Sequence, residues 1–312
     1  MSYQQTDVHV NKPLTDYAIR FLQDDANFIA DKVAPKVNSI KLADKYYTYD
    51  RAPWRQSDDL RKAGTQSNKG VTANLSTAAF LIEKYSLHDV VPDDVMDEAD
   101  SPIEPQQDTV ADLVEQLMIN KEIRCKDEFF VTSSVQNYTS LATASQWGYT
   151  STTTPIDDFD TGNFAIQKEI GKESNQATIG NEVYKVLKNH EDILDRIKYT
   201  QKGIITADII AACMDIDSLL IGKGIYMTTG EGITSESMSY IWGKNMLIQY
   251  VSPRPSKKRL THGSQFVKKG GGASVKSFYD DKADGQYVEP SIYYDFKAVS
   301  KLCGYTIFGA VA

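Results

Sequence analysis

The segment from Ile204 to Val251 constrains the fold most, because it strings together several short elements and holds no residue set that could run a reaction. Its pattern predicts a helix, two strands joined by a Gly-Lys-Gly turn at 222–224, a polar loop and a closing strand: Thr206–Asp215, Ser218–Ile221, Ile225–Thr228, Thr229–Ser237 and Tyr240–Val251. The segment thus contains a predicted helix and several predicted strands but no recognisable set of catalytic residues. We therefore expect it to serve architecture rather than catalysis.

The bulk properties point to a folded, acidic protein. A chain of 312 residues with 41% hydrophobic side chains can fill the core of one large or two medium domains. Its net charge of -8 argues against a dedicated DNA-binding protein, which needs a cationic face. Cys125, Cys213 and Cys303 are widely spaced and fit buried thiols in a reducing compartment. With no apolar run of membrane-spanning length and no signal-peptide pattern, we expect synthesis in the cytoplasm and no membrane partner.

Two parts of the chain are too polar to bury themselves. Residues 1–45 read as an arm with one helix, which Thr15-Asp16 caps and Pro35 ends. Residues 45–51 and 74–85 read as the strands of a long hairpin around a polar centre at 54–70. A hairpin of this kind is marginal alone, and ordering it costs conformational entropy. Both parts are expected to lie against another surface, in the same chain or in a neighbour.

The strongest helical signal lies between Ser101 and Val131. Ser101-Pro-Ile-Glu104 is a capping-box start, and Asp108 can cap the longer helix that follows. Its apolar stripe includes Val110, Leu113, Val114, Leu117 and Met118, while its outer face is expected to hold Asp112, Glu115, Lys121 and Glu122.

The remaining elements are predicted more coarsely. Residues 132–160 read as a loop region, and helices are expected at 164–170 and 179–188 on either side of a turn at Gly171. The last two strands are expected at 288–296 and 299–308, with Gly304 as a bend.

Charge is segregated along the chain. No Lys or Arg lies between Tyr85 and Asn120, where acidic residues cluster without the glycine and ligand spacing of a calcium loop. The plain interpretation is a solvated acidic face. The alternative pairs this face with the hairpin loop of a neighbouring subunit, because complementary charges steer association and fix register. The contact candidates on the two sides are Trp54, Arg55, Asp58, Asp59, Arg61 and Lys62 in the loop, and Asp93, Asp94, Asp97 and Glu98 in the acidic cluster.

No other motif indicates chemistry. The basic run from Lys257 to Lys269, with His262, lacks the interleaved aromatics of a nucleic-acid platform and reads as a solvated loop. Gly171-Lys172 and Gly222-Lys223-Gly224 miss the phosphate-loop pattern and read as turns. His190 reads as a satisfied polar group at a helix end, and no nucleophile or metal-ligand spacing occurs. We expect no catalytic residue, no cofactor and no metal, and hence no enzyme.

Three segments carry a family resemblance that covers about residues 30–312. Asp97–Leu117 resembles the acidic, proline-marked approach to the spine helix of tailed-phage major capsid proteins with the Hong Kong 97-like fold. Asp208–Tyr226 and Tyr240–Val251 resemble the axial domain of that fold. Ile292–Ile307 is similar to the strand pair that returns to its peripheral domain.

The resemblance implies an α+β fold and a division of the chain into four parts. These are an N-terminal arm, an extended hairpin loop, a peripheral domain with a long spine helix and an axial domain: 1–45, 46–90, 91–159 with 251–312, and 160–250. In the axial domain, Glu231 and Glu236 of the polar loop become further contact candidates around the capsomer centre.

The resemblance also implies a function. Hexamers and pentamers of the chain would form an icosahedral virion shell around packaged double-stranded DNA, assembled in the host cytoplasm. Scaffold and portal proteins would take part in assembly, with the scaffold as a separate protein, and decoration proteins are left open. A bacterial encapsulin-type compartment shares the fold and is the first alternative. A soluble α+β enzyme with a site invisible in the sequence is the second.

Overall fold

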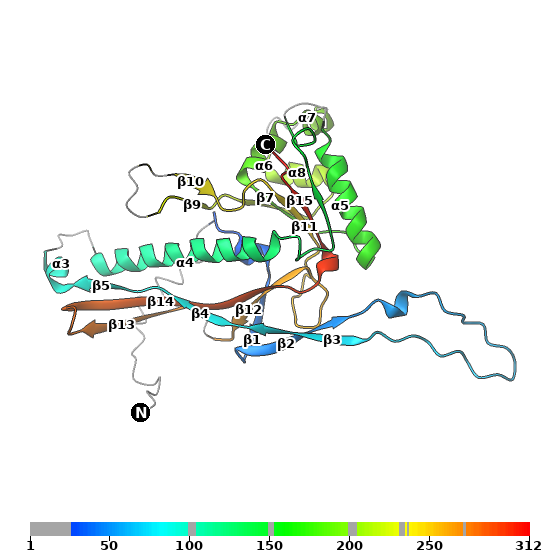
Figure 1. The fold of residues 1–312 in the computed structure, drawn as a ribbon, viewed down its shortest axis with the longest axis horizontal. Coiled ribbons are helices and arrows are strands. Elements are labelled where there is room, and N and C mark those ends of the chain that lie inside the picture. The colour runs from blue at the N-terminus through cyan, green and yellow to red at the C-terminus, as the bar shows by residue number, and fades with distance from the viewer. Residues whose placement is uncertain are drawn as a thin grey trace.

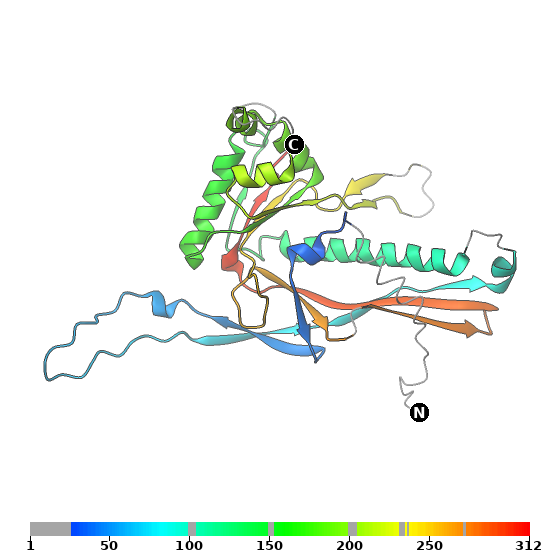
Figure 2. The same cartoon turned by 180° about the vertical axis from the view of Figure 1, so that it is seen from behind.

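The computed structural model describes residues 26–98, 104–148, 153–198, 205–230, 235, 237–270 and 273–312. Figure 1 shows a compact upper body, a long helix lying over an elongated sheet, and a hairpin that reaches away from both. The opposite view in Figure 2 shows the same three parts.

The upper body is built on a five-stranded sheet whose strand order differs from the chain order. The order is β6 (Asn137–Ser140), β15 (Gly304–Phe308), β11 (Met246–Gln249), β7 (Gln176–Gly180) and β8 (Ser218–Gly222). Every residue of β7 and β11 is buried, as expected for central strands covered on both faces. The helices of this body are α5 (Pro155–Ile170), α6 (Asn181–Lys188), α7 (Glu191–Ile197) and α8 (Ala207–Cys213).

The elongated sheet is organised around β14 (Gly285–Ala298), which pairs antiparallel with four other strands. Those partners are β12 (Gly263–Lys268), β13 (Ala273–Asp280), β4 (Glu83–Ser86) and β5 (Asp89–Pro92), and β1 (Lys36–Ser39) pairs with β12 in parallel. The helix α4 (Pro105–Phe129) lies along this sheet (Figure 1). Its 25 residues correspond to roughly 38 Å of helix.

Two hairpins leave these bodies. Among the described strands, β2 (Ala43–Tyr49) and β3 (Leu75–Leu81) pair only with each other. They form the root of the extended hairpin, and the 3-10 turn η1 (Ala52–Trp54) follows β2. β9 (Ile225–Met227) and β10 (Met238–Tyr240) form the second hairpin, which projects from the upper body. The remaining short elements are α2 (Ala30–Val33), α3 (Asp93–Asp97) and η2 (Lys301–Cys303).

Glu122 of α4 joins the two bodies and the arm. Its Oε1 accepts a hydrogen bond from the Ala30 amide at 2.5 Å, and its Oε2 accepts one from Trp242 Nε1 at 2.6 Å. Glu122 is fully buried and Lys121 is nearly so. The prediction that both residues lie on the outer face of the helix is therefore wrong, because the upper body and the arm cover this side of α4.

Several predicted boundaries need correction. The helix expected at 179–188 begins only at Asn181, since Ile179 and Gly180 end β7. A Cβ on Gly180 would lie 1.8 Å from the Gly243 carbonyl oxygen, so this strand end is fixed by a close backbone approach. The loop region expected at 132–160 contains β6 and the first turns of α5, and the helix expected at 164–170 is the second half of α5.

The closing strand expected over Tyr240–Val251 is two strands, β10 and β11, which belong to different sheets. Gly243 lies between them with a φ of 57°, in the left-handed region that glycine tolerates. The last two strands are likewise not a pair. β14 lies in the elongated sheet and β15 in the upper body, and the stretch at 273–280 adds the unpredicted strand β13.

The longest helix begins at Pro105, three residues before the expected cap at Asp108. The predicted capping box at 101–104 and the arm helix start at 15–16 lie largely outside the described residues. Within the described part of the arm, α2 ends at Val33, close to Pro35 as predicted.

Candidate assembly surfaces

The extended loop between β2 and β3 exposes almost all of its side chains. Leu60 and Trp54 are 71% and 62% exposed, and Arg55, Asp58, Asp59, Arg61 and Lys62 are exposed as well. The loop is shaped by its own polar groups. Asp58 accepts hydrogen bonds from the Leu60 amide at 3.1 Å and, through its carbonyl, from Asn68 at 2.8 Å, and Arg61 Nε donates to the Thr65 carbonyl at 2.9 Å. These bonds give the loop a defined form without covering it.

The root of the loop is fixed to the upper body. Arg51 forms an ion pair with the Glu169 carboxylate at the end of α5 and donates to the Glu169 carbonyl at 3.1 Å. The Trp54 ring lies 3.7 Å from where a Cβ on Gly171 would stand. A cavity of about 320 Å³ opens at this root, with Tyr49 and Leu260 among its lining residues. The loop therefore leaves the molecule in a set direction.

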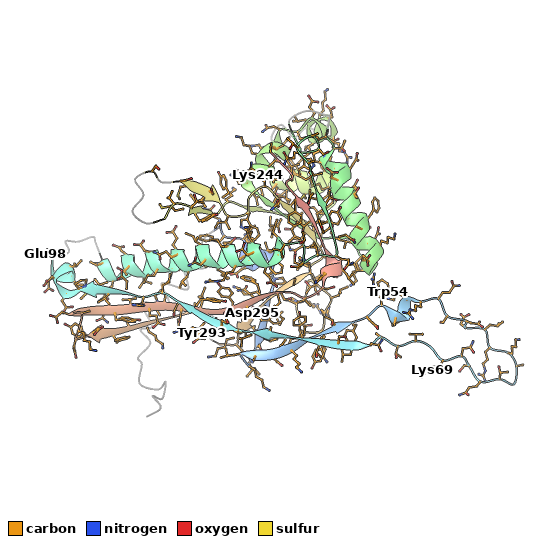
Figure 3. All side chains as sticks on the ribbon, in the orientation of Figure 1. Trp54, Lys69, Glu98, Lys244, Tyr293 and Asp295 are labelled. Atoms are coloured by element: carbon orange, nitrogen blue, oxygen red, sulfur yellow. The ribbon has the colours of Figure 1, made fainter. Side chains whose placement is uncertain are left out.

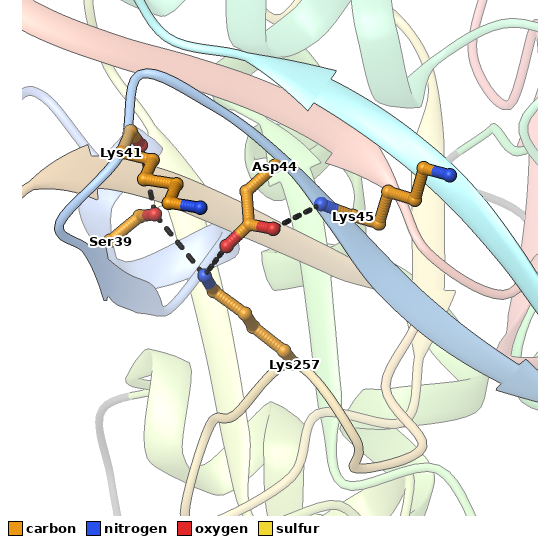
Figure 4. A network of polar contacts seen from close by, with 5 residues as sticks. All are labelled: Ser39, Lys41, Asp44, Lys45 and Lys257. Atoms are coloured by element: carbon orange, nitrogen blue, oxygen red, sulfur yellow. Dashed lines mark hydrogen bonds and ion pairs between the residues drawn. The ribbon is translucent and has the colours of Figure 1, made fainter.

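A second anchor comes from the basic run (Figure 4). Lys257 Nζ contacts Asp44 Oδ2 at 2.5 Å and Ser39 Oγ at 3.1 Å, and its carbonyl accepts a bond from the Tyr47 amide at 3.0 Å. The Lys257 ammonium lowers the pKa of the Asp44 carboxyl through their hydrogen bond.

His262 of the same run is fully buried, and desolvation lowers its pKa to about 4. Its Nδ1 lies 2.8 Å from Gln249 Oε1. The prediction of a solvated loop is therefore wrong for Lys257 and His262. Lys257 binds Asp44 and Ser39 at the root of the hairpin, and His262 packs between the two bodies.

The acidic candidates lie on α3 and directly after it. Asp94, Asp97 and Glu98 are exposed and form no ion pair with any described residue. Asp93 is half-buried and accepts a hydrogen bond of 2.8 Å from the Tyr279 hydroxyl. This bond is the largest cause of the raised pKa of Tyr279. Asp93 is thus engaged within its own chain, and the free acidic surface consists of the other three carboxylates.

One copy of the chain does not bring the two candidate groups together. Figure 3 labels Lys69 in the extended loop and Glu98 beside α3, at opposite ends of the molecule. The body of the subunit lies between them. A contact between the loop and the acidic surface therefore requires a second copy. Glu231 and Glu236, the candidates in the polar loop, lie outside the described residues.

The sequence interpretation missed the buried polar junction between the bodies. Gln249 Nε2 donates to the Val33 carbonyl at 3.0 Å and to Gln176 Oε1 at 3.1 Å, and Gln249 also meets His262. A signal for Glu122 was available, because Met118, Glu122 and Cys125 recur at the spacing of one helix face. For Gln249 and His262 only the fold reveals the contact.

Other expectations can be followed on the structure. His190 is buried at the start of α7, where its Nδ1 accepts a bond from the Asp192 amide at 3.2 Å, as predicted for a satisfied helix-end histidine. Cys125 and Cys303 are buried free thiols, and Cys213 is a half-buried one. Among the described residues, no group of three or more His, Cys, Asp or Glu side chains is placed to hold a metal ion. No helix in that same part of the chain has the length and apolarity to span a bilayer.

Comparisons with known proteins identify the fold. No protein-family profile matches the chain. The major capsid protein of Burkholderia phage BcepMu is 25% identical over 249 residues, which cover 78% of this chain and 76% of that protein. The crystal structure of a phage-related protein from Bordetella bronchiseptica RB50 matches with a TM-score of 0.75 and 20% identity, over 98% of this chain and 99% of that one.

More distant structures share the same architecture. The capsid structure of cyanophage P-SCSP1u matches with a TM-score of 0.54 and 9% identity, over 100% of this chain and 91% of that one. The SrpI encapsulin of Synechococcus elongatus PCC 7942 matches with a TM-score of 0.56 and 9% identity, over 99% of this chain and 93% of that one. The chain has the α+β fold of Hong Kong 97-like phage capsid proteins, as the sequence predicted.

Proposed function

We infer that the chain is a phage major capsid protein, a structural subunit that associates with copies of itself to build the shell of a virion. One observation carries this conclusion: the fold of phage capsid structures accounts for essentially the whole chain. The relative that matches over 78% of the chain, a major capsid protein, supports the same function. A shell subunit also explains why a polar loop of more than twenty residues is exposed in a single copy, since neighbouring subunits supply its missing contacts.

We assign residues 1–45 to the arm, 46–90 to the extended hairpin, 160–250 to the axial domain, and 91–159 with 251–312 to the peripheral domain. The upper body supports an axial assignment for its strands β7, β8 and β11. Two strands from outside the axial range, β6 and β15, complete the same sheet. The two domains thus share one hydrogen-bonded framework, which suits a subunit that transmits load across a shell.

In the assembled shell, the extended loop of each subunit lies over the acidic end of its neighbour. Arg55, Arg61 and Lys62 face solvent in one copy, as do Asp94, Asp97 and Glu98. The two surfaces carry opposite charge and lie at opposite ends of the molecule, so copies placed side by side bring them together. Complementary charge at such a contact fixes register and speeds association more than it adds affinity.

Hexamers and pentamers of the subunit form an icosahedral shell that holds double-stranded DNA, assembled in the host cytoplasm with a scaffold and a portal protein. Support for DNA as non-specific content is the net charge of -8, which disfavours tight binding of phosphates to the lining. An encapsulin-type compartment is the second candidate, because an encapsulin shares the fold. Purified particles that contain a protein cargo and no nucleic acid would favour it.

Particle sizing tests the function directly. The purified protein, 34.8 kDa as a chain, is expected to form rings or shells of megadalton mass by light scattering. A stable monomer whose melting temperature rises with a small ligand would point to a soluble enzyme instead.

A further inference from the structure

The hairpin β9–β10 presents an unusual apolar face. Ile225 pairs with Tyr240 and Met227 pairs with Met238, so these four side chains share one face of the ribbon. All four are exposed: 47% for Ile225, 37% for Tyr240, 48% for Met227 and 53% for Met238. The opposite face holds Tyr226, which packs into the core at the junction of the two bodies. The hairpin is therefore fixed to its own subunit and turns its apolar face outward.

A second exposed apolar feature, the side chain of Phe164, lies on α5. Gly162 packs this helix closely on the sheet, because a Cβ there would stand 2.7 Å from Ile248 and 2.8 Å from Tyr305. The opposite stripe, Asp157, Thr161, Phe164 and Lys168, is exposed. Phe164 is its apolar centre and is 66% exposed. A single exposed apolar side chain is common on protein surfaces, so Phe164 gains its significance from the complementary apolar face of the hairpin.

Charges around the two features are complementary. Lys223 lies in the turn before the hairpin, and Lys244 follows the hairpin after Gly243. On α5, Asp157 and Asp160 precede Phe164 by two turns and one turn. None of these four charges forms an ion pair within the described residues. Lys168, one turn after Phe164, also forms no ion pair within the described residues, so the charge complementary to Lys223 and Lys244 lies at the N-terminal part of the stripe, with Asp157 and Asp160.

The two features lie on opposite sides of the upper body. In Figure 1 the hairpin projects to the left and α5 lies on the right, and Figure 2 shows the reverse. A surface that meets a different surface on the next copy generates a ring when the rotation closes. The extended loop projects on the α5 side and the acidic α3 lies on the hairpin side, so the same neighbour satisfies both contacts.

We propose that the Ile225, Met227, Met238 and Tyr240 face of one subunit docks on the Phe164 stripe of α5 in the adjacent subunit of the same ring. This inference rests on the proposed capsid function and names one of its lateral interfaces. It assigns the apolar contact to the hairpin strands rather than to the polar loop between them.

Reciprocal charge variants test the docking. Met227→Lys and Phe164→Glu are each expected to lower the amount of assembled particles at least tenfold, measured by light scattering at equal protein concentration. The double variant Met227→Lys/Phe164→Glu is expected to restore assembly, because each copy in a pentamer or a hexamer then sets its new lysine against the new glutamate of the adjacent copy. Leu194→Glu, at an exposed apolar position on α7 outside this contact, is the matched control and should assemble normally.

The outcomes separate this inference from the capsid function. If the wild-type protein forms particles but both single variants assemble as well as the control, or the double variant folds and stays unassembled, the docking is overturned while the function stands. If the wild-type protein itself stays monomeric, the function fails. Circular dichroism melts of the unassembled subunits establish that each variant folds, and a variant that melts early is replaced by Met227→Ser or Phe164→Ser.

Discussion

The indole nitrogen of Trp242 donates a hydrogen bond of 2.6 Å to the carboxylate of Glu122, from the upper body to the long helix α4. The second carboxylate oxygen accepts the Ala30 amide of the arm, so one side chain joins three parts of the subunit. Burial is the largest effect on this carboxyl and raises its pKa from 4.5 to about 7. The junction between the bodies is therefore sensitive to pH near neutrality.

Glu122→Gln is expected to remove a pH-dependent part of the stability. A carboxyl whose pKa is raised on folding binds more protons in the folded state, so the free energy of unfolding falls as pH rises from about 4.5 to about 7. The loss amounts to on the order of 3 kcal/mol. Urea unfolding of the subunit at pH 5 and pH 8 should show this loss in the wild type and not in Glu122→Gln. Glu115→Gln, on the exposed face of α4, is the control, and equal pH dependence in all three proteins would contradict the account.

Gly222→Ala is expected to destabilise the subunit by about 3 kcal/mol or more, since overpacking a rigid site forces neighbouring groups to move. A Cβ at this position would stand 2.0 Å from Cδ1 of Trp242, which the Glu122 bond holds in place. Thermal melts followed by circular dichroism measure the effect. Gly230→Ala is the control because its Cβ would meet no atom within 4 Å. Similar melting temperatures for the two variants would argue against the tight packing of Trp242 on Gly222.

Lys257→Gln is expected to loosen the root of the extended hairpin. The ammonium group contacts Asp44 and Ser39, and it also lies 5.2 Å from the centre of the Phe80 ring. Hydrogen exchange followed by mass spectrometry should show faster exchange in β2 and β3, with little change in β11. Lys45→Gln removes an exposed lysine from β2, next to Asp44, and serves as the control. If hydrogen exchange in β2 and β3 is unchanged in Lys257→Gln, the ion pair of Arg51 with Glu169 is enough to hold the root of the hairpin, and the prediction is wrong.

Arg61→Glu combined with Lys62→Glu is expected to block assembly at low salt and leave the subunit folded, because both side chains are exposed. Adding Asp94→Lys and Asp97→Lys should restore particles if the loop faces the acidic surface of a neighbour. Particle yield across a series of salt concentrations is the measurement, since screening weakens both repulsion and attraction. Normal shells from the Arg61→Glu, Lys62→Glu variant alone would contradict the proposed charge pairing.

The sequence supported the fold where short-range patterns decide it. The segment 206–228 follows its prediction closely, as α8, β8 and β9, because the apolar run at 218–221 and the Gly-Lys-Gly turn are local signals. Boundaries failed where contacts distant in sequence decide. Ile179 and Gly180 belong to a strand rather than to the following helix because they pair with Ile221, Gly222 and β11.

For the candidate site too, the sequence predicts exposure where composition decides it and fails where the packing of distant segments decides it. The exposure of Arg55, Arg61 and Lys62 follows from their composition, and the structure agrees. The buried state of Glu122 and His262 contradicts their polar character, and only the meeting of two bodies explains it. Phe164 carried no signal in the sequence, because an apolar residue in a helical pattern indicates a core position until the packing of the opposite face is known.

Electron cryomicroscopy of the purified, assembled protein shows whether and how copies of the subunit meet. We expect a closed shell of hexamers and pentamers in which residues 51–74 of each subunit lie over α3 of the adjacent one. A preparation that contains only monomers of 34.8 kDa at high protein concentration, with the fold intact, would contradict it.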